Sequence, residues 1–366
     1  MKHLFAIGFL TIGLLVSGTI RAASPKVVEQ VVLYPSVGPQ GDTLLLSGCI
    51  SVPVAKQPKG IILLAHYTIG ANDEAPSMGK AFEARYFRNE YILVMPDYIG
   101  FGSTRDRMRP YLDGALTARN CIDMLQAATP LIDSIRPGTC TDSIYVCGFS
   151  QGGAVALWIT QLIEAEYADR WHIKKCFAGS GPYDVATTYD VAVNTNKVGL
   201  AMSVPLLILG TDEAYDLHLE RDFFFTPELI AAYEQHMVQK NENVLSLALH
   251  MNHHRLDYWM TAQGRDKTQT QTQRLYAGFM RSSLVHFPMK SEEFEQDTIC
   301  PNAPKTSIFV FHSTQDDVVD FQNAANLYRC WSDAPNIRYD FGRYGNHLQS
   351  LLTFYSRVNK QLKMEK

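Results

Sequence analysis

The chain has 366 residues, of which 46% are hydrophobic and 19% are charged. This composition can fill a sizeable core, so it excludes disordered and fibrous proteins. The 33 Lys and Arg residues face 37 Asp and Glu residues, and a formal net charge of −4 leaves no basic excess to neutralise a nucleic-acid backbone. We therefore predict one large α/β domain with an insertion, and no nucleic acid among its partners.

The N-terminal segment has the layout of a secretory signal peptide. Lys2 gives it a positive start, residues 4–16 form an apolar run, and Ala22 and Ala23 are small residues near the expected cleavage point. The apolar run is too short to span a membrane. The sequence predicts that residues 1–23 are removed, which leaves an exported protein, periplasmic or secreted, without a transmembrane segment. The alternative interpretation is a buried N-terminal helix.

The next segments predict a sheet that begins antiparallel and continues parallel. Residues 27–34 and 43–54 have the pattern of two strands joined by a Gly- and Pro-containing turn at 38–42. Later strands are indicated by four short, almost continuous apolar runs, at residues 60–65, 91–95, 143–147 and 306–311. Strands that are apolar on both faces belong to a parallel sheet covered by helices. Residues 112–125 and 155–162 carry apolar side chains at helical spacing and predict two of those helices.

This alternation of strands and helices stops between residues 182 and 299. Helix formers dominate there, and Thr226 and Pro227 have the pattern of a helix cap and first helical residue. Residues 266–274 are polar and predict a loop or an exposed helix. The sequence thus predicts a core made of residues 24–181 and 300–366, with residues 182–299 as a helical insertion. The large apolar residues of the insertion are expected to line a pocket or fill a core: Phe223, Phe224, Phe225, Tyr258 and Trp259.

The strongest chemical motif is the segment from Gly148 to Gly153, which reads Gly-Phe-Ser-Gln-Gly-Gly. It follows a buried strand and precedes an amphipathic helix, which is the context that a nucleophile elbow requires. Ser150 would then stand on a strained turn, with Gly148 and Gly152 at positions where a Cβ would crowd the backbone. The helix that follows offers free backbone N–H groups to an anion. The alternative is an ordinary Gly-rich turn.

A serine nucleophile needs a base, and the base needs an acid that orients it. In this type of fold the chain order is Ser, acid, His. Asp316 follows the late buried strand and is the predicted acid, with Asp317 and Asp320 as competitors. His347 is the predicted base, because it is the only histidine after His312 and precedes a C-terminal helix. A surface histidine is the alternative at that position.

The remaining histidines and the cysteines favour structural roles. His66 ends a buried strand and is expected to orient its neighbours, while the helically spaced His250, His253 and His254 are expected on a solvated or pocket-lining face. No CxxC pair occurs among the seven cysteines, which argues against a structural zinc site. Two cysteines in apolar runs, Cys147 and Cys176, are expected in the core. A disulfide between Cys300 and Cys330 is one possible pairing, and the sequence leaves the connectivity open.

Together these segments resemble the α/β-hydrolases of the secretory lipase type, which are similar to lipase-A-like esterases. The resemblance rests on five stretches that run through most of the mature chain: 66–68, 96–102, 109–112, 148–153 and 316–319. It implies an α/β-hydrolase fold with a helical cap inserted after the sixth strand. It also implies that the second oxyanion donor follows the third strand, at Thr68. Tyr67 departs from the family pattern, which has Gly there, and Asp320 stands where Pro is usual.

The sequence therefore predicts an exported serine carboxylic-ester hydrolase of the esterase or lipase type. Ser150 would attack the ester, His347 would move the proton, and Asp316 would hold the imidazole, while the N–H groups of Gln151 and Thr68 bind the oxyanion. We expect a small-molecule, lipid or carbohydrate ester as substrate, and neither a metal nor an organic cofactor. One alternative is a serine peptidase of the prolyl-oligopeptidase type, although only residues 24–149 precede Ser150. The other is a non-catalytic binding module on the same scaffold.

Overall fold

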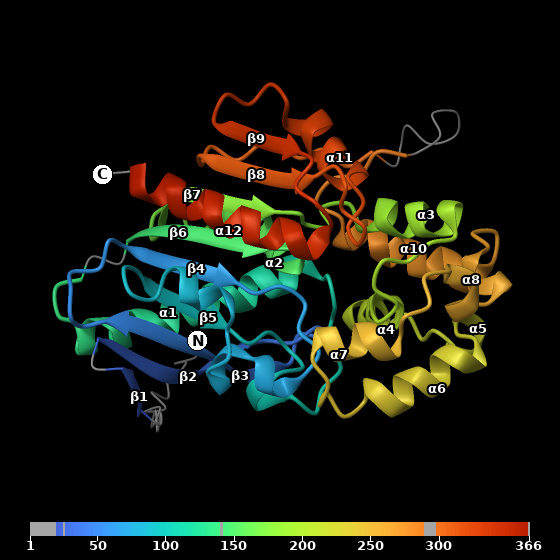
Figure 1. Ribbon diagram of the computed structural model, residues 1–366, viewed down its shortest axis with the longest axis horizontal. Coiled ribbons are helices and arrows are strands. Elements are labelled where there is room, and N and C mark those ends of the chain that lie inside the picture. The colour runs from blue at the N-terminus through green and yellow to red at the C-terminus, as the bar shows by residue number, and fades with distance from the viewer. Residues whose placement is uncertain (1–19, 25, 140–141, 289–297, 365–366) are drawn as a thin grey trace, which may run out of the picture.

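The structure is a computed structural model that describes residues 20–24, 26–139, 142–288 and 298–364. It contains a nine-stranded sheet with helices on both faces (Figure 1), in the strand order β1-β2-β3-β5-β4-β6-β7-β8-β9. The strands β1 to β3 and the pair β3–β5 are antiparallel, and β5, β4 and β6 to β9 form a parallel series. The strand bounds are β1 Ile20–Ser24, β2 Val27–Val37, β3 Thr43–Pro53, β4 Ile61–Ala65, β5 Ile92–Pro96, β6 Ser143–Phe149, β7 His172–Gly179, β8 Ile308–Ser313 and β9 Ile337–Gly342.

The predicted fold class is confirmed. The antiparallel entrance and the four apolar runs all form strands of this sheet. Strand β7 did not stand out in the sequence, because Lys174 and Lys175 interrupt its apolar run. In the structure, His172 and Lys174 at its start are exposed and the last four residues are buried. Residues 1–19 of the predicted signal peptide lie outside the described residues. The residues that follow form β1, which pairs with β2.

Alternate residues of the central strands pack on opposite faces of the sheet. Ile61 and Leu63 of β4 belong to the core beneath α1 (Gly114–Ile135) and α2 (Gln151–Glu166). Ile62 and Leu64 point to the other face and share a core with α12 (His347–Met364). Figure 1 shows these two layers, with α12 on the near side of the sheet. The continuous apolar runs are thus explained by burial on both faces.

A helical segment lies between β7 and β8, beyond the carboxyl ends of the parallel strands (Figure 1). It follows the sixth strand when the count begins at β2, as predicted. Its helices are α3 Val185–Thr195, α4 Ser203–Tyr215, α5 Arg221–Phe224, α6 Pro227–His236, α7 Val244–His250, α8 Leu256–Trp259, α9 Ala262–Arg265 and α10 Thr270–Ser282. Thr226 caps α6 by accepting from the N–H of Leu229, and Pro227 begins that helix, as the sequence predicts.

The insertion has an apolar core of its own. Phe224, Leu229 and Phe279 are fully buried in it. Of the five large residues that the sequence placed in a pocket wall or a core, Phe224, Phe225 and Trp259 lie in this core, Phe223 packs partly buried against it, and Tyr258 is exposed. These positions therefore stabilise the insertion more directly than they shape a pocket.

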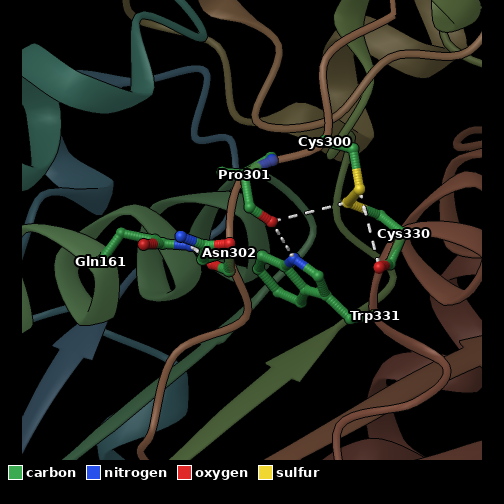
Figure 2. The surroundings of a disulfide bond; sticks show 6 residues. All are labelled: Gln161, Cys300, Pro301, Asn302, Cys330 and Trp331. Carbon is green, nitrogen blue, oxygen red and sulfur yellow. Dashed lines mark hydrogen bonds between the residues drawn. A yellow bond between two sulfur atoms is a disulfide. The ribbon is translucent and has the colours of Figure 1, made fainter.

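Cys300 and Cys330 form a disulfide where the chain returns from the insertion to the sheet (Figure 2). It joins the segment before β8 to α11 (Gln322–Trp331), and the indole N–H of Trp331 donates to the carbonyl of Pro301 at 2.8 Å. Cys147 and Cys176 are fully buried in the core, as expected. No helix in the described part of the chain is both long and apolar enough to cross a membrane.

Candidate active site

Ser150 occupies the sharp turn between β6 and α2. Its φ of 56° and ψ of −126° lie in a region that non-glycine residues rarely adopt. The turn is possible because the backbone of Gly148 approaches that of Gly152: a Cβ on Gly148 would lie 2.1 Å from the carbonyl oxygen of Gly152. A Cβ on Gly152 would lie equally close to the carbonyl oxygen of Ala65. Glycine at both positions thus lets the strand turn directly into the helix with the serine at its apex.

The structure brings Ser150, His347 and Asp316 into one hydrogen-bonded chain. The Nε2 atom of His347 lies 2.9 Å from the hydroxyl oxygen of Ser150. On the other side of the ring, Nδ1 lies 2.7 and 2.9 Å from the two carboxylate oxygens of Asp316. The three residues come from the β6–α2 turn, the start of α12 and the loop after β8, and all of these lie at the carboxyl ends of parallel strands. A neutral imidazole held in this way can accept the serine proton at Nε2.

Asp316 is held rigidly in a buried position. Its side chain is fully buried, and the backbone N–H groups of Val318 and Val319 donate to Oδ1 at 3.0 and 2.9 Å. Burial alone would raise the pKa of this carboxyl, but His347 and the other donors outweigh burial and lower the pKa overall. Asp316 is therefore a carboxylate at neutral pH.

The two competing aspartates have other partners. Asp317 accepts from the backbone N–H of His347 at 3.1 Å, and Asp320 accepts from the backbone N–H of Gln322. Asp317 thus holds the start of α12, while only Asp316 of the three contacts the imidazole ring. The bond between Asp317 and the His347 backbone could not be read from the sequence, because it depends on how two distant segments meet.

His312 supports the loop that carries Asp316. It is fully buried, and its Nε2 lies 2.9 Å from the carbonyl oxygen of Val319, one of the residues that hold Asp316. Burial lowers the pKa of His312, so the ring is neutral and donates its Nε2 proton to that carbonyl. His312 is a supporting residue beside the acid rather than a second base.

Thr68 and Gln151 lie next to each other beside Ser150. Gln151 is the first residue of α2, and Thr68 is in the loop after β4, with its hydroxyl 3.4 Å from the side-chain oxygen of Gln151. Among the described hydrogen bonds, none has the backbone N–H of either residue as its donor. Two free N–H groups beside a serine can bind an oxyanion.

The loop that carries Thr68 is fixed by two contacts that the sequence did not indicate. The Thr68 hydroxyl lies 2.7 Å from the hydroxyl of Tyr111, and the backbone N–H of Tyr67 donates to Glu83 at 3.1 Å. Glu83 is buried, and burial raises its pKa to about 7. The sequence pointed to Tyr111 only through the stretch 109–112, which resembles the secretory lipase type. No pattern in the sequence pointed to Glu83.

His66 is packed as a structural residue. Its Nδ1 lies 2.6 Å from the carbonyl oxygen of Tyr67 and its Nε2 lies 3.1 Å from that of Asp97. Its ring stacks on Tyr98 at 3.9 Å, and burial lowers its pKa to about 4. These contacts support the orienting role that the sequence suggested.

A cavity of about 360 Å³ lies between the Asp316 loop and the insertion. Asp316 and Asp317 line one side, and the other side is largely apolar, with Leu207 and Ile208 of α4 among its lining residues. The insertion approaches this loop so closely that a Cβ on Gly199 would lie 1.8 Å from the carbonyl oxygen of Asp317. A larger cavity of about 770 Å³ lies between residues 105–109 and α6, and neither Ser150 nor His347 is among the lining residues of either cavity.

Comparisons with known proteins show the family and the fold of the chain. The family model for secretory lipases matches residues 77–355. Among solved structures, the rice cell wall degrading esterase LipA from Xanthomonas oryzae superposes with a TM-score of 0.74 at 18% identity, over 93% of this chain and 90% of that one. A putative hydrolase from Legionella pneumophila gives the same score and identity over 95% and 90%. Lipase A from Candida antarctica gives 0.62 at 16% identity over 88% and 73%. No curated protein sequence gave a significant match.

Proposed function

Because the chain belongs to the secretory lipase family, we propose that it is an exported serine hydrolase that cleaves carboxylic esters with Ser150, His347 and Asp316. The family makes it a lipase or esterase, and the residues and mechanism are our inference. The observation that carries this inference is the continuous chain of contacts from the serine hydroxyl through the imidazole to a buried carboxylate.

In the proposed mechanism, Ser150 attacks the ester carbonyl while Nε2 of His347 takes its proton. The imidazolium then gives this proton to the leaving alcohol, and an acyl-enzyme remains. Water, activated by the same imidazole, releases the acid and restores Ser150. Asp316 holds Nδ1 protonated and stabilises the imidazolium, because its carboxylate lies within 2.9 Å of that nitrogen through both oxygens.

The N–H groups of Gln151 and Thr68 are proposed to bind the oxygen that becomes negative in the tetrahedral intermediate. Both groups are free, and Gln151 adds the positive end of the α2 dipole. Each such donor contributes on the order of 3 kcal/mol to transition-state stabilisation. Since the loop of Thr68 is held by Tyr111 and Glu83, this donor is positioned before the substrate binds.

Residues 182–299 are proposed to act as a cap that receives the acyl group. The cavity beside Asp316 is apolar on its cap side and has the volume of a small-molecule site. The cap supplies no triad or oxyanion residue, so we expect it to set which esters bind rather than how they are cleaved. This organisation suits a small-molecule, lipid or carbohydrate ester.

The proposal is tested by labelling the secreted protein with a fluorophosphonate and by assaying esters and peptides in parallel. We expect stoichiometric labelling at Ser150, hydrolysis of esters, and no cleavage of peptides. Ser150→Ala should lose the label and all ester turnover, while Ser332→Ala, which changes an exposed serine, should keep both. Ester hydrolysis that survives in folded Ser150→Ala would refute the proposed nucleophile, and preferred cleavage of peptides would favour a peptidase.

A further inference from the structure

A second cluster of carboxylate and imidazole groups lies in the insertion, away from Ser150. His236 ends α6, His250 ends α7, and Glu242 stands in the loop between the two helices. The Nδ1 atoms of the two histidines lie 2.7 and 2.6 Å from the two carboxylate oxygens of Glu242. The two rings stack with centroids 4.4 Å apart, so both histidines present the same edge to one carboxylate.

This set of donors has the composition of a transition-metal site. One ligand atom from each of the three side chains lies within 4.8 Å of the other two. Imidazole nitrogen and carboxylate oxygen both bind Zn²⁺, at about 2.0–2.2 Å, so the oxygen and nitrogen atoms need to separate by less than about 1 Å to admit an ion between them.

The cluster is also accessible. His236 is largely buried, with a side chain 15% exposed, whereas His250 is 48% exposed at the surface. An ion can therefore enter from solvent, and water can complete its coordination. We propose that His236, Glu242 and His250 form a binding site for a divalent transition-metal ion, with Zn²⁺ as the expected occupant.

The neighbouring histidines do not take part in this site. The ring of His253 stacks on Tyr258 at 3.9 Å, and Nδ1 of His254 lies 3.4 Å from the carbonyl oxygen of Val198. Sequence spacing groups these two with His250, but the structure pairs His250 with His236 and Glu242, which precede it by 14 and 8 residues. The site was hidden because its ligands come from two helices and the loop that joins them.

The position of the site suggests what a bound ion does. The loop that carries Glu242 packs on the loop after β4: the carbonyl of Lys240 accepts from the N–H of Asn72 at 2.8 Å, and a Cβ on Gly70 would lie 2.4 Å from the carbonyl oxygen of Glu242. Residues 70–72 lie in the same loop as Thr68, separated from it only by Ile69. An ion that joins α6 to α7 thus fixes the part of the cap that rests on this loop, and acts as a structural clamp.

The alternative for the same contacts is a clamp made of hydrogen bonds alone, in which each neutral imidazole donates its Nδ1 proton to Glu242. The two arrangements differ in a measurable way, because a metal ion displaces both of those protons. The test starts from full-length secreted protein without an affinity tag, freed of metal with a chelator that is then removed. Zn²⁺ is titrated by calorimetry, and Co²⁺ is titrated as a spectroscopic probe.

We expect one ion per chain, visible absorption from bound Co²⁺, and a rise in Tm on adding Zn²⁺. His250→Asn and Glu242→Gln should each weaken binding by at least about tenfold and remove the rise in Tm, because each takes away one of three protein ligands. His253→Asn is the matched control and should bind as the wild type does. In the wild type, NMR signals of the His236 and His250 rings should shift on titration, which reports on the site without any substitution.

The proposal fails if the wild-type protein binds no ion, or if the variants bind as tightly as the wild type. It also fails if the ring signals of His236 and His250 stay unchanged while Zn²⁺ binds elsewhere. A wild-type protein that binds nothing, together with a lower Tm in His250→Asn, would establish the clamp of hydrogen bonds instead. None of these outcomes depends on ester hydrolysis, so the result stands apart from the proposed function.

Discussion

The cluster at Ser150 and the cluster around Glu242 each bring a carboxylate against the Nδ1 atom of a histidine, and the surroundings of the two contacts differ. At the sheet, Asp316 is fully buried and hydrogen-bonds the imidazole of His347, whose far nitrogen reaches Ser150. Nε2 of the buried His312 lies 3.7 Å from the same carboxylate. In the insertion, the Glu242 side chain is 23% exposed and contacts two imidazoles. The distances between carboxylate oxygen and Nδ1 are nearly the same, 2.7 Å in the closer contact at Asp316 and 2.6 Å in the closer contact at Glu242.

The difference shows that the contact alone does not define a catalytic group. In the proposed mechanism the imidazole at the sheet acts as a base, because a strained turn places a serine on its other side. It is also held by a backbone bond to Asp317. The cluster in the insertion has no nucleophile and two rings on one carboxylate, which suits the binding of a cation. The surroundings of such a contact, rather than its geometry, therefore decide whether the carboxylate takes part in a reaction or stabilises the fold.

The largest expected effect tests the catalytic half of this comparison. Asp316→Asn should lower kcat by about 10⁴-fold, because the amide no longer selects the tautomer with its proton on Nδ1. Asp317→Asn is the matched control and should cost less than about tenfold, since an amide oxygen can still accept from the His347 backbone. Steady-state ester hydrolysis by folded variants measures both. If Asp317→Asn were the more damaging change, Asp317 would be the acid.

The sequence indicated which residues meet at the edge of the sheet, whereas it did not indicate the contacts within the insertion, and the difference has a physical reason. Chain order and the strand–turn–helix context indicated Ser150, Asp316 and His347, because each follows a strand whose carboxyl end lies at the same edge of the sheet. Support from Asp317, Glu83 and Tyr111 was not visible, since it arises where segments distant in sequence touch.

The insertion has no comparable rule of position. Its helices pack on each other rather than on a sheet of known order, so its existence and a helix start at Thr226 could be predicted but its contacts could not. The aromatic residues that were expected to line a pocket or to fill a core largely fill its core. Strand β7 was missed for a different reason, because two lysines break the apolar pattern on which its detection depends.

Glu83 sharpens the comparison, because it is a buried carboxyl without an imidazole. Burial raises its pKa to about 7, against about 4.5 in an unfolded chain. Its contribution to stability is therefore complete below pH 4.5 and is lost as the pH rises through 7, by about 3 kcal/mol in all. Glu83→Gln should remove this loss and so exceed the wild type in stability at pH 8 but not at pH 4.5.

Urea unfolding of both proteins across this pH range measures the effect, with the exposed Glu90→Gln as a control. If the stability of the wild type relative to Glu83→Gln were the same at pH 8 as at pH 4.5, Glu83 would be charged and satisfied in the folded protein.

The cavity beside Asp316 tests whether the cap sets specificity. Leu207 lies on its apolar side, so Leu207→Trp should fill part of the 360 Å³ and exclude long acyl groups. We expect kcat/KM for long-chain esters to fall about 10- to 100-fold relative to short-chain esters, since each methylene in an apolar pocket is worth roughly 1–3 kcal/mol. Leu249→Trp, on the exposed side of α7, is the matched control. Equal losses on every ester would mean that Leu207 supports the fold of the cap instead.

The smallest effect is expected in the metal-free cluster of the insertion, where exposure to solvent weakens each ionic contact. With chelator present at pH 7, Glu242→Gln should lower the free energy of unfolding by less than about 1 kcal/mol, as is usual for ion pairs near the surface. Hydrogen bonds from His236 above all, and from Ser246 and His250, lower the pKa of Glu242 to about 2, below the 4.5 of an unfolded chain. Its contribution is therefore present above pH 4.5 and is lost as the pH falls toward 2. Urea unfolding at pH 7, 4.5 and 3 should show the two proteins converging as the pH falls. A difference of several kcal/mol at pH 7, or one that persists at pH 3, would mean that this cluster is as tightly coupled to the fold as the buried carboxylate of Asp316.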